Sequence, residues 1–210
     1  MIKQSIKYLI FFSLFFSLVS SGQADILHIK VYDDVGGDFT LTDQHGKSFV
    51  MSEQNEKLTL LFFGYLNCPD ICPMTLSEMM EVKSLLGANK NQVQFAMVTL
   101  DPERDTQEQL RLYMMNFDPE FLGLYGDRKT TDEIAKRYHV LHKKRILRSG
   151  LGYSVDHSGG AYLVDKKGRL RYIFPSKSPA SRFVQGIEMI LEGKASEEIR
   201  KPTWLEKLVR

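Results

Sequence analysis

Cysteine is scarce in this chain, which has two, Cys68 and Cys72, among its 210 residues. A structural zinc site normally takes four protein ligands, and no second cysteine pair is present to complete one. A catalytic zinc, with three protein ligands and a water, stays open. No cysteine stands directly after the apolar N-terminal segment either, which argues against a lipid attached at the mature N-terminus.

Long apolar runs are also lacking. The most apolar N-terminal stretch, Tyr8 to Val19, has about a dozen residues, whereas a membrane-spanning helix needs about 20. Lysines precede this stretch and the small residues Gly22 and Ala24 follow it, which is the pattern of a secretory leader. We therefore expect residues 1–24 to be a signal peptide cleaved after Ala24, and the protein to be exported to the periplasm. An uncleaved leader would instead tether it to the membrane.

An excess of charge of one sign is missing too. The formal net charge is +2, and removal of the leader with its two lysines leaves 26 basic residues against 26 acidic ones. A balanced surface has no strong electrostatic footprint for nucleic acid, so we expect no nucleic-acid partner. No internal repeat or low-complexity linker divides the chain, and about 185 mature residues suit one domain. We expect that domain over residues 25–195 and a charged tail over residues 196–210.

What the sequence does have is an apolar run that leads to the cysteine pair. Leu58 to Leu66 has the length and the Phe and Leu content of a buried strand. After Cys68 the apolar residues recur at helical spacing, so a strand leads through a turn into a helix, with both thiols at the junction. Backbone N–H groups at a helix N-terminus favour the thiolate, which is the reactive and metal-binding form of cysteine.

The rest of the chain alternates between strand-like and helix-like patterns. Thr106 with Gln109, and Thr130 with Glu133, have the spacing of capping boxes that open two helices. Residues 141–156 show no clear period, so we expect a surface excursion there. The other expected elements are strands over 26–30, 93–100 and 121–125, hairpins over 39–51 and 160–174, and a last helix opened by Ser178 and Pro179. This order indicates an α/β sandwich whose sheet is parallel in its first half and closed by a hairpin.

The spacing of Cys68 and Cys72 allows two kinds of chemistry. Residues four apart on a regular helix have Cα atoms about 6 Å apart, which suits a disulfide and also lets two sulfurs converge on one ion. Thiolates are soft ligands that suit Cu(I), whereas Cu(II) favours an added imidazole. His157, just before a buried strand, is the candidate for that third ligand, and the alternative is an ordinary loop histidine. The histidines for which we expect no ligand role are His45, His139 and His142.

Three aspartates near these motifs each have two interpretations. Asp70, between the cysteines, either modulates metal binding or recognition, or is an acid favoured at the first turn of a helix by the helix dipole. Asp101 and Asp105 either orient the site from behind its ligands or serve turn and capping roles next to Pro102. The sequence leaves both interpretations open.

Three sequence blocks follow one another along the chain. They are Gly-Tyr at 64–65 with Cys-Pro-Asp-Ile-Cys-Pro at 68–73, Asp-Pro-Glu-Arg-Asp-Thr at 101–106, and Tyr-Ser-Val-Asp-His-Ser at 153–158. Together they resemble the Sco/SenC family of copper chaperones. The resemblance implies a thioredoxin-like fold, with a central mixed sheet, an added N-terminal β-hairpin and flanking helices. It also implies copper, as Cu(I) or Cu(II), held by Cys68, Cys72 and His157, and a role in assembling the copper centre of cytochrome oxidase.

Four functions compete on this sequence. The first is a metallochaperone without turnover, which passes copper to a copper-receiving protein such as a cytochrome oxidase subunit. A copper donor and a thiol reductant would be its further partners. The second is a thiol–disulfide oxidoreductase, in which the dithiol of Cys68 and Cys72 reduces a partner's cysteines before metal loading and itself becomes the redox-active disulfide. The other two are a thiol peroxidase with Cys68 as nucleophile, and a structural disulfide in an exported binding module.

The cysteine spacing favours metal binding over exchange chemistry. Thiol–disulfide oxidoreductases usually have Cys-x-x-Cys and a facing cis-proline. This chain has one more residue between its cysteines, and the matching loop reads His-Ser-Gly-Gly from 157 to 160, without proline. We therefore place the metallochaperone first and the oxidoreductase second.

Overall fold

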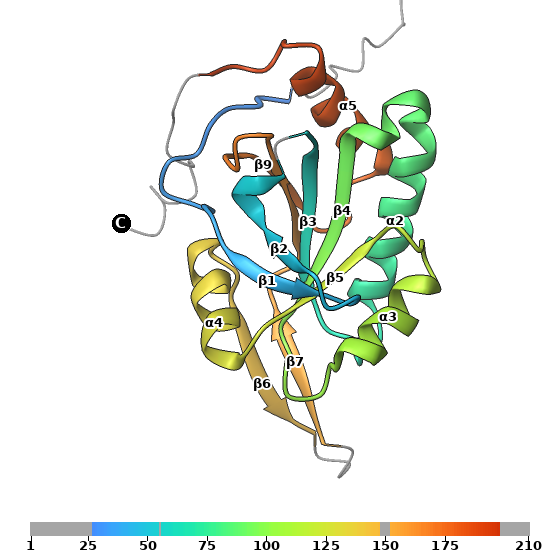
Figure 1. Ribbon diagram of the computed structural model, residues 1–210, viewed down its shortest axis with the longest axis vertical. Helices are drawn as coiled ribbons and strands as arrows, with labels where there is room; N and C mark the ends of the chain where they lie inside the picture. The colour runs from blue at the N-terminus through green and yellow to red at the C-terminus, as the bar shows by residue number, and fades with distance from the viewer. Residues whose placement is uncertain (1–26, 55, 148–151, 198–210) are drawn as a thin grey trace, which may run out of the picture.

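The computed structural model describes residues 27–54, 56–147 and 152–197, so the predicted leader and most of the predicted tail lie outside the described residues. A seven-stranded sheet in the order β2-β1-β5-β4-β3-β8-β9 forms the centre of the molecule (Figure 1). Its strands are β1 (Thr40–Asp43), β2 (Ser48–Val50), β3 (Leu58–Gly64), β4 (Val93–Thr99), β5 (Leu122–Tyr125), β8 (Gly160–Val164) and β9 (Leu170–Pro175). A separate sheet pairs β6 (His142–Ile146) with β7 (Tyr153–His157).

The large sheet is mixed, as the sequence predicts. β3 pairs in parallel with β4, and β4 pairs in parallel with β5. On the other side of β3, β8 pairs with β3 in antiparallel orientation, and β9 pairs with β8 in antiparallel orientation. Every residue of β3 is buried, which explains its continuous apolar run, since helices cover both faces of a central strand. The β1–β2 hairpin, with Gly46 in its turn, is added at the β5 edge.

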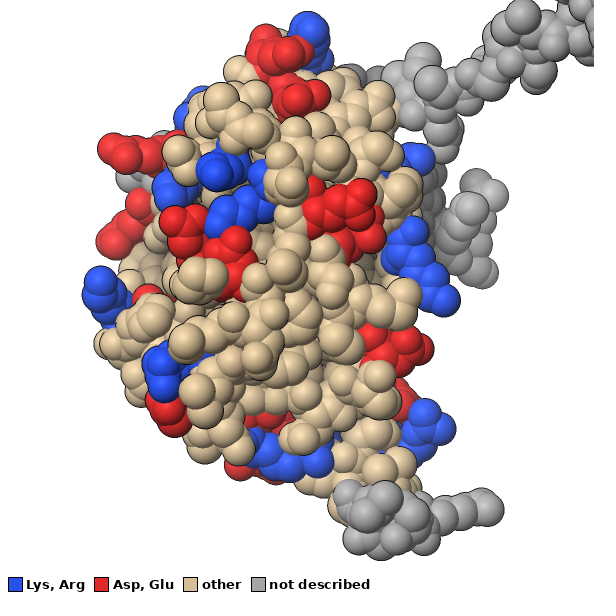
Figure 2. All heavy atoms as spheres, turned by 90° about the vertical axis from the view of Figure 1, so that its right-hand side faces the viewer, with Lys and Arg blue, Asp and Glu red and all other residues tan. Residues whose placement is uncertain are grey.

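Helices cover both faces of this sheet. On one face lie α2 (Ile71–Leu85), α3 (Gln107–Met115) and α5 (Ala180–Leu191), and on the other lies α4 (Arg128–Arg137) (Figure 1). Two 3-10 turns, η1 (Met51–Glu53) and η2 (Gly87–Gln92), complete the regular elements. On the face shown in Figure 2, acidic and basic side chains intersperse around a broad uncharged area.

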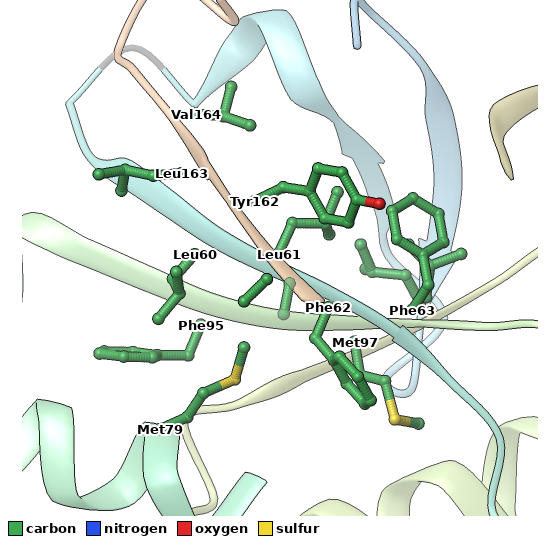
Figure 3. Close-up of a cluster of buried hydrophobic side chains, with 14 of the residues drawn as sticks. Leu60, Leu61, Phe62, Phe63, Met79, Phe95, Met97, Tyr162, Leu163 and Val164 are labelled. Carbon is green, nitrogen blue, oxygen red and sulfur yellow. The ribbon is translucent and has the colours of Figure 1, made fainter. Parts of the chain in front are cut away.

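Alternation along β3 divides the core into two layers. Leu60 and Phe62 point towards Met79 of α2, whereas Phe63 points to the opposite side (Figure 3). There the Phe63 ring packs against Tyr138, which follows α4, with ring centroids 5.4 Å apart. Burial of each such side chain contributes about 1.5–3 kcal/mol. Both layers continue to the end of β3, so they hold rigidly the segment from which the cysteine turn departs.

Of the two predicted capping boxes, one forms. The Thr106 hydroxyl accepts from the Gln109 N–H while the Gln109 side chain accepts from the Thr106 N–H, which opens α3. The box predicted at Thr130 and Glu133 is wrong. The N-cap of α4 is Asp127, whose carboxylate accepts from the Thr130 N–H at 2.7 Å. Because Asp127, three residues before Thr130, is the N-cap, the helix begins earlier than predicted and Thr130 lies inside its first turn.

The predicted surface excursion does lie at the surface in its described parts, residues 141–147 and 152–156, where it forms the paired strands β6 and β7 that the sequence does not predict. Four of the five residues of β6 are exposed, because the strand projects from the body of the molecule (Figure 1). An exposed strand needs no alternation of apolar and polar residues. The sequence therefore carries no periodic signal for it.

Two other segments also differ from expectation. The described part of residues 26–30 forms no strand, although the N–H groups of Lys30 and Tyr32 donate to carbonyls of β9 at 3.2 and 3.0 Å. Ser178 does not cap α5, since its hydroxyl donates to the Pro175 carbonyl and Pro179 is the N-cap. Among the residues that the structure describes, no helix combines the length and apolar character that crossing a bilayer requires.

Candidate metal centre

Both cysteines lie where β3 passes into α2. β3 ends at Gly64, the chain turns, and α2 begins three residues after Cys68. Cys68 therefore lies in the turn, where its N–H donates to the Tyr65 carbonyl at 3.3 Å, and Cys72 is the second residue of the helix. The two cysteines do not share a regular helix, so it is the turn that brings their sulfurs together.

Gly64 allows this close approach. A Cβ atom at Gly64 would lie 2.9 Å from the Sγ of Cys72 and 2.6 Å from a ring carbon of Phe62. Contacts this short are essentially never seen, so any side chain here would displace the thiol or the ring. Glycine at the end of the central strand therefore lets the Cys72 sulfur sit directly against the sheet.

His157 reaches the same place from the far half of the chain, as the last residue of β7. Its Nε2 lies 3.5 Å from the Sγ of Cys72, and the donor atoms of Cys68, Cys72 and His157 all lie within 4.8 Å of one another. Its Nδ1 lies 3.2 Å from the Ser158 carbonyl oxygen. An N–H at Nδ1 would donate to that carbonyl and leave Nε2 as the free lone pair. The fold thus places two sulfurs and one imidazole nitrogen where a single ion can contact all three.

Aromatic rings hold the imidazole of His157 in place. Phe62 of β3 and Tyr65 of the cysteine turn pack edge-on against it, with ring centroids 6.3 and 6.0 Å away. Such pairs contribute about 0.5–1.5 kcal/mol each beyond their buried area. The imidazole is therefore held in a defined position beside the thiols.

The two cysteines are free thiols in different surroundings. Cys72 is fully buried, whereas Cys68 is partly exposed. A hydrogen bond from the Cys72 thiol, with a further contribution from His157, outweighs desolvation and lowers the pKa of Cys68 to about 3. The same bond, together with burial, raises the pKa of Cys72. At neutral pH the pair therefore presents one accessible thiolate and one buried thiol.

The Asp105 side chain forms a hydrogen bond with the cysteine turn, whereas the Asp70 side chain makes no capping hydrogen bond to α2. The Asp105 carboxylate accepts from the Leu66 N–H at 3.1 Å and from the Thr99 hydroxyl at 2.5 Å. Burial raises the pKa of Asp105 to about 6. Asp70 is exposed and its side chain makes no capping hydrogen bond to α2. Roles for either residue in metal binding or recognition stay predictions.

Asp101 connects the same loop to β7. Its buried carboxylate accepts from the Tyr153 hydroxyl at 2.7 Å and from Nε of Arg104 at 2.5 Å. The guanidinium carbon of Arg104 lies 3.7 Å from the centroid of the Tyr153 ring, and Nη1 donates to the Tyr153 carbonyl at 2.9 Å. The sequence patterns assign no role to Arg104 or Tyr153. The signal that could have found Tyr153 is strand alternation, which places residues 153, 155 and 157 on one face.

Among the described residues no other histidine belongs to this group, although His142 lies opposite His157 in the β6–β7 ladder. His142 pairs with Asp132 at 2.9 Å, and His45 is exposed in the β1–β2 turn. Within residues 27–54, 56–147 and 152–197, the single set of three His, Cys, Asp or Glu side chains close enough to hold one ion is Cys68, Cys72 and His157. The geometry brings together the three predicted ligands, and their binding of a metal stays a prediction.

The chain is similar in sequence to proteins of one family. The sequence model of the SCO1/SenC family matches residues 29–192. The SCO2-like protein RC0895 of Rickettsia conorii is 33% identical over 156 residues, which cover 72% of this chain and 76% of that protein.

Solved structures are similar as well. The structure of Bradyrhizobium japonicum ScoI with copper bound has a TM-score of 0.67 and 36% identity, and the match covers 73% of this chain and 98% of that one. Yeast Sco1 with copper bound has a TM-score of 0.69 and 28% identity, with 82% and 98% covered. The predicted thioredoxin-like fold, with its mixed central sheet and flanking helices, is confirmed.

Proposed function

Because the chain belongs to the SCO1/SenC family, we propose that it is an exported copper metallochaperone, which holds copper through Cys68, Cys72 and His157 and delivers it to a copper enzyme. The proposed recipient is the copper centre of cytochrome oxidase, the role that the sequence resemblance implies. The observation that carries the proposal is the convergence of two sulfurs and one imidazole nitrogen within 4.8 Å. Copper is the cargo of this protein and not the cofactor of a reaction.

The donor set suits copper in both oxidation states. Two thiolates satisfy the soft Cu(I) ion, and the imidazole of His157 adds the nitrogen that Cu(II) favours. Because the pKa of Cys68 is lowered and that of Cys72 is raised, metal binding has to displace the proton of Cys72. A disulfide would remove both thiolates, so a reductant has to act before copper loads.

Relatives support the choice of metal, and the leader supports export. Bradyrhizobium ScoI and yeast Sco1 have both been solved with copper bound. Residues 1–24 have the pattern of a secretory leader. N-terminal sequencing of the protein recovered from the periplasm tests the cleavage. Asp25 is expected as the first residue, and Met1 would contradict a cleaved leader.

Copper reconstitution tests the donor set. The reduced domain is loaded without oxygen with Cu(I), or separately with Cu(II), and compared with Cys72→Ser, His157→Ala and the control His45→Ala. We expect one tightly bound copper per chain in wild type and control, and loss of that copper in Cys72→Ser. In His157→Ala the sulfur-to-Cu(II) charge-transfer band should shift or vanish. An unchanged Cu(II) spectrum in His157→Ala would contradict the three-ligand site.

Delivery needs its own experiment. The copper-loaded protein is mixed with the metal-free copper-binding domain of a cytochrome oxidase subunit, and the charge-transfer bands of both are followed. We expect the donor's band to decay as the recipient's band appears, faster than when the same recipient is loaded from a copper buffer of equal free copper. Equal rates would argue against delivery.

A second function, thiol–disulfide exchange, is favoured by the unequal exposure of the thiols. An accessible thiolate at Cys68 and a buried thiol at Cys72 resemble an attacking and a resolving cysteine. This function predicts catalytic reduction of a disulfide-bonded partner in the absence of copper. A stoichiometric reaction that stops after one turnover, even with an added thiol reductant, would exclude it.

A further inference from the structure

The β6–β7 hairpin carries His157 but belongs to a sheet of its own. Its strands pair with each other, from His142 opposite His157 to Ile146 opposite Tyr153, and with no strand of the large sheet among the described residues. In Figure 1 the hairpin projects from the lower end of the molecule. Among the described residues no ladder to the large sheet fixes β7, so contacts of its side chains with the body of the molecule contribute to its orientation.

Alternation places three side chains of β7 on its inner face. Val155 is buried, while Tyr153 and His157 are partly buried, and Asp156 on the outer face is exposed. Successive side chains of a strand point to opposite faces. Tyr153 therefore shares a face with His157, four residues and about 13 Å along the strand.

Tyr153 is held by three contacts to the loop that follows β4. Its hydroxyl donates to Asp101, its carbonyl accepts from Arg104, and its ring lies under the Arg104 guanidinium at 3.7 Å. Lys144 lies 4.7 Å from the same ring and pairs with Glu103 of the loop. Charge-assisted hydrogen bonds and cation–π contacts of this kind are stronger when partly desolvated.

This contact is achieved at some cost to the fold. Asp101 is fully buried, and Nη2 of Arg104 is buried without a hydrogen-bond partner among the described residues. Buried polar nitrogens are rarely left unpaired, and each one calls for a reason. The position of Arg104 is therefore explained by its contacts with Tyr153 and Asp101, and not by the hydrogen bonding of its own guanidinium nitrogens.

The same loop also reaches the other half of the metal centre. Asp105 accepts from the Leu66 N–H in the cysteine turn. One short loop, residues 101–105, thus touches the segment that carries the thiols and the strand that carries the imidazole. It sets the spacing between segments that lie about 90 residues apart in sequence.

We infer that Tyr153, clamped by Arg104 and Asp101, is a positioning residue that fixes His157 at coordinating distance from the thiols. This inference rests on the proposed function, because it concerns the same three ligands. Tyr153 does not touch the metal, and it acts through the orientation of β7. Loss of the clamp leaves the thiol pair intact and lets the imidazole move away.

The test compares Tyr153→Leu, which removes ring stacking and hydroxyl, with Tyr153→Phe, which keeps the ring. Arg145→Ala is the matched control, since Arg145 pairs with Asp156 on the outer side of the same hairpin. In Tyr153→Leu we expect Cu(II) affinity to fall by about 10–100-fold, the range for residues that orient metal ligands. The Cu(II) charge-transfer band should move towards that of His157→Ala. Tyr153→Phe should lie between wild type and Tyr153→Leu, and the control should match wild type.

Two readouts separate positioning from a merely structural role. Cu(I), which the two thiolates hold, should still bind at one per chain in Tyr153→Leu. In the metal-free protein, the NMR signals of the His157 ring should shift in Tyr153→Leu and not in Arg145→Ala. Equal loss of Cu(I) and Cu(II), or an unchanged ring signal with a wild-type Cu(II) spectrum, would overturn the inference.

The outcomes also separate this inference from the proposed function. If the Cu(II) spectrum of the wild type does not depend on His157, the three-ligand function itself fails, and the inference fails with it. If it does depend on His157 and Tyr153→Leu retains it, the function stands and the positioning role alone fails.

Discussion

At the scale of the residue, the two thiols differ more than their spacing suggests. Cys68 is partly exposed and its pKa is lowered by the neighbouring Cys72 thiol, whereas Cys72 is buried and its pKa is raised by the same neighbour and by burial. A ligand from another molecule therefore meets Cys68 first. The Cys72 sulfur is packed against Gly64, so a partner cannot reach it as easily.

This difference predicts selective alkylation of the reduced, metal-free protein. At pH 6 iodoacetamide should modify Cys68 and spare Cys72, as mapped by peptide mass spectrometry. Cys72→Ala removes the donor that lowers the pKa of Cys68, so the rate of Cys68 modification at pH 6 should fall by about tenfold. Equal modification of both cysteines in the wild type would contradict the assignment.

Asp105 predicts a pH dependence of stability. Its pKa is raised from 3.8 to about 6 by burial, so between these values the folded state binds more protons than the unfolded state. The free energy of unfolding should therefore fall as pH rises from about 4 to 6, by an amount on the order of 2 kcal/mol relative to Asp105→Asn. Urea unfolding of both proteins across this range checks it, and a difference that is constant with pH would count against it.

At the scale of the element, helix starts are set by single polar side chains and strands by their neighbours. α3 begins with a complete capping box, and α4 begins at an aspartate placed ahead of the expected threonine. β6 has no apolar period, because four of its five residues are exposed. Contacts of a few residues, at Tyr153 above all, replace the missing ladder.

The start of α4 gives a prediction with its own control. Asp127→Ala removes the acceptor of the Thr130 N–H and should lower the free energy of unfolding by about 1 kcal/mol. Glu133→Ala, at the exposed position that a capping box would have used, should change it by less than about 0.5 kcal/mol. Chemical denaturation of the two variants measures both free energies of unfolding. A larger loss in Glu133→Ala than in Asp127→Ala would favour the capping box of Thr130 and Glu133.

At the scale of the whole molecule, the metal centre and a buried ion cluster lie at opposite ends of the sheet. The thiols follow the last residue of β3, whereas Arg171 follows Leu170, which is paired through Val164 to Thr59 near the start of β3. Five strand residues separate these ends by about 17 Å. Arg171 is 2% exposed and holds Asp165, the Lys30 carbonyl and the Ser196 carbonyl together.

Stability and copper binding should therefore be separable. Arg171→Met leaves two carbonyls and part of the Asp165 charge without their donor, and should cost about 3 kcal/mol of unfolding free energy. The exposed neighbour Lys166→Met should cost less than about 0.5 kcal/mol. Both variants should retain the wild-type Cu(II) spectrum. A changed spectrum in Arg171→Met would show that the two ends of the sheet are coupled.

Sequence patterns predict the parts of this protein in which local chemistry decides. The apolar run of β3, the Thr106 box and the cysteine pair are each visible within a short window. Other features depend on segments far apart in sequence. Examples are the approach of His157 to Cys72 and the stacking of Arg104 on the Tyr153 ring. Both depend on segments that meet only after folding. No local window contains both partners, so strand alternation can place Tyr153 on the face of His157, but its contacts with Arg104 and Asp101 are found only in the structure.

Because β6 and β7 form a sheet of their own, β7 could change its position without a change in the pairing of the seven-stranded sheet. Moving the imidazole away breaks a few side-chain contacts and leaves every hydrogen bond of the seven-stranded sheet intact. A docking protein that competes for Tyr153 would convert three donors into two without unfolding anything. Release of the ion would then begin at nitrogen and finish at sulfur.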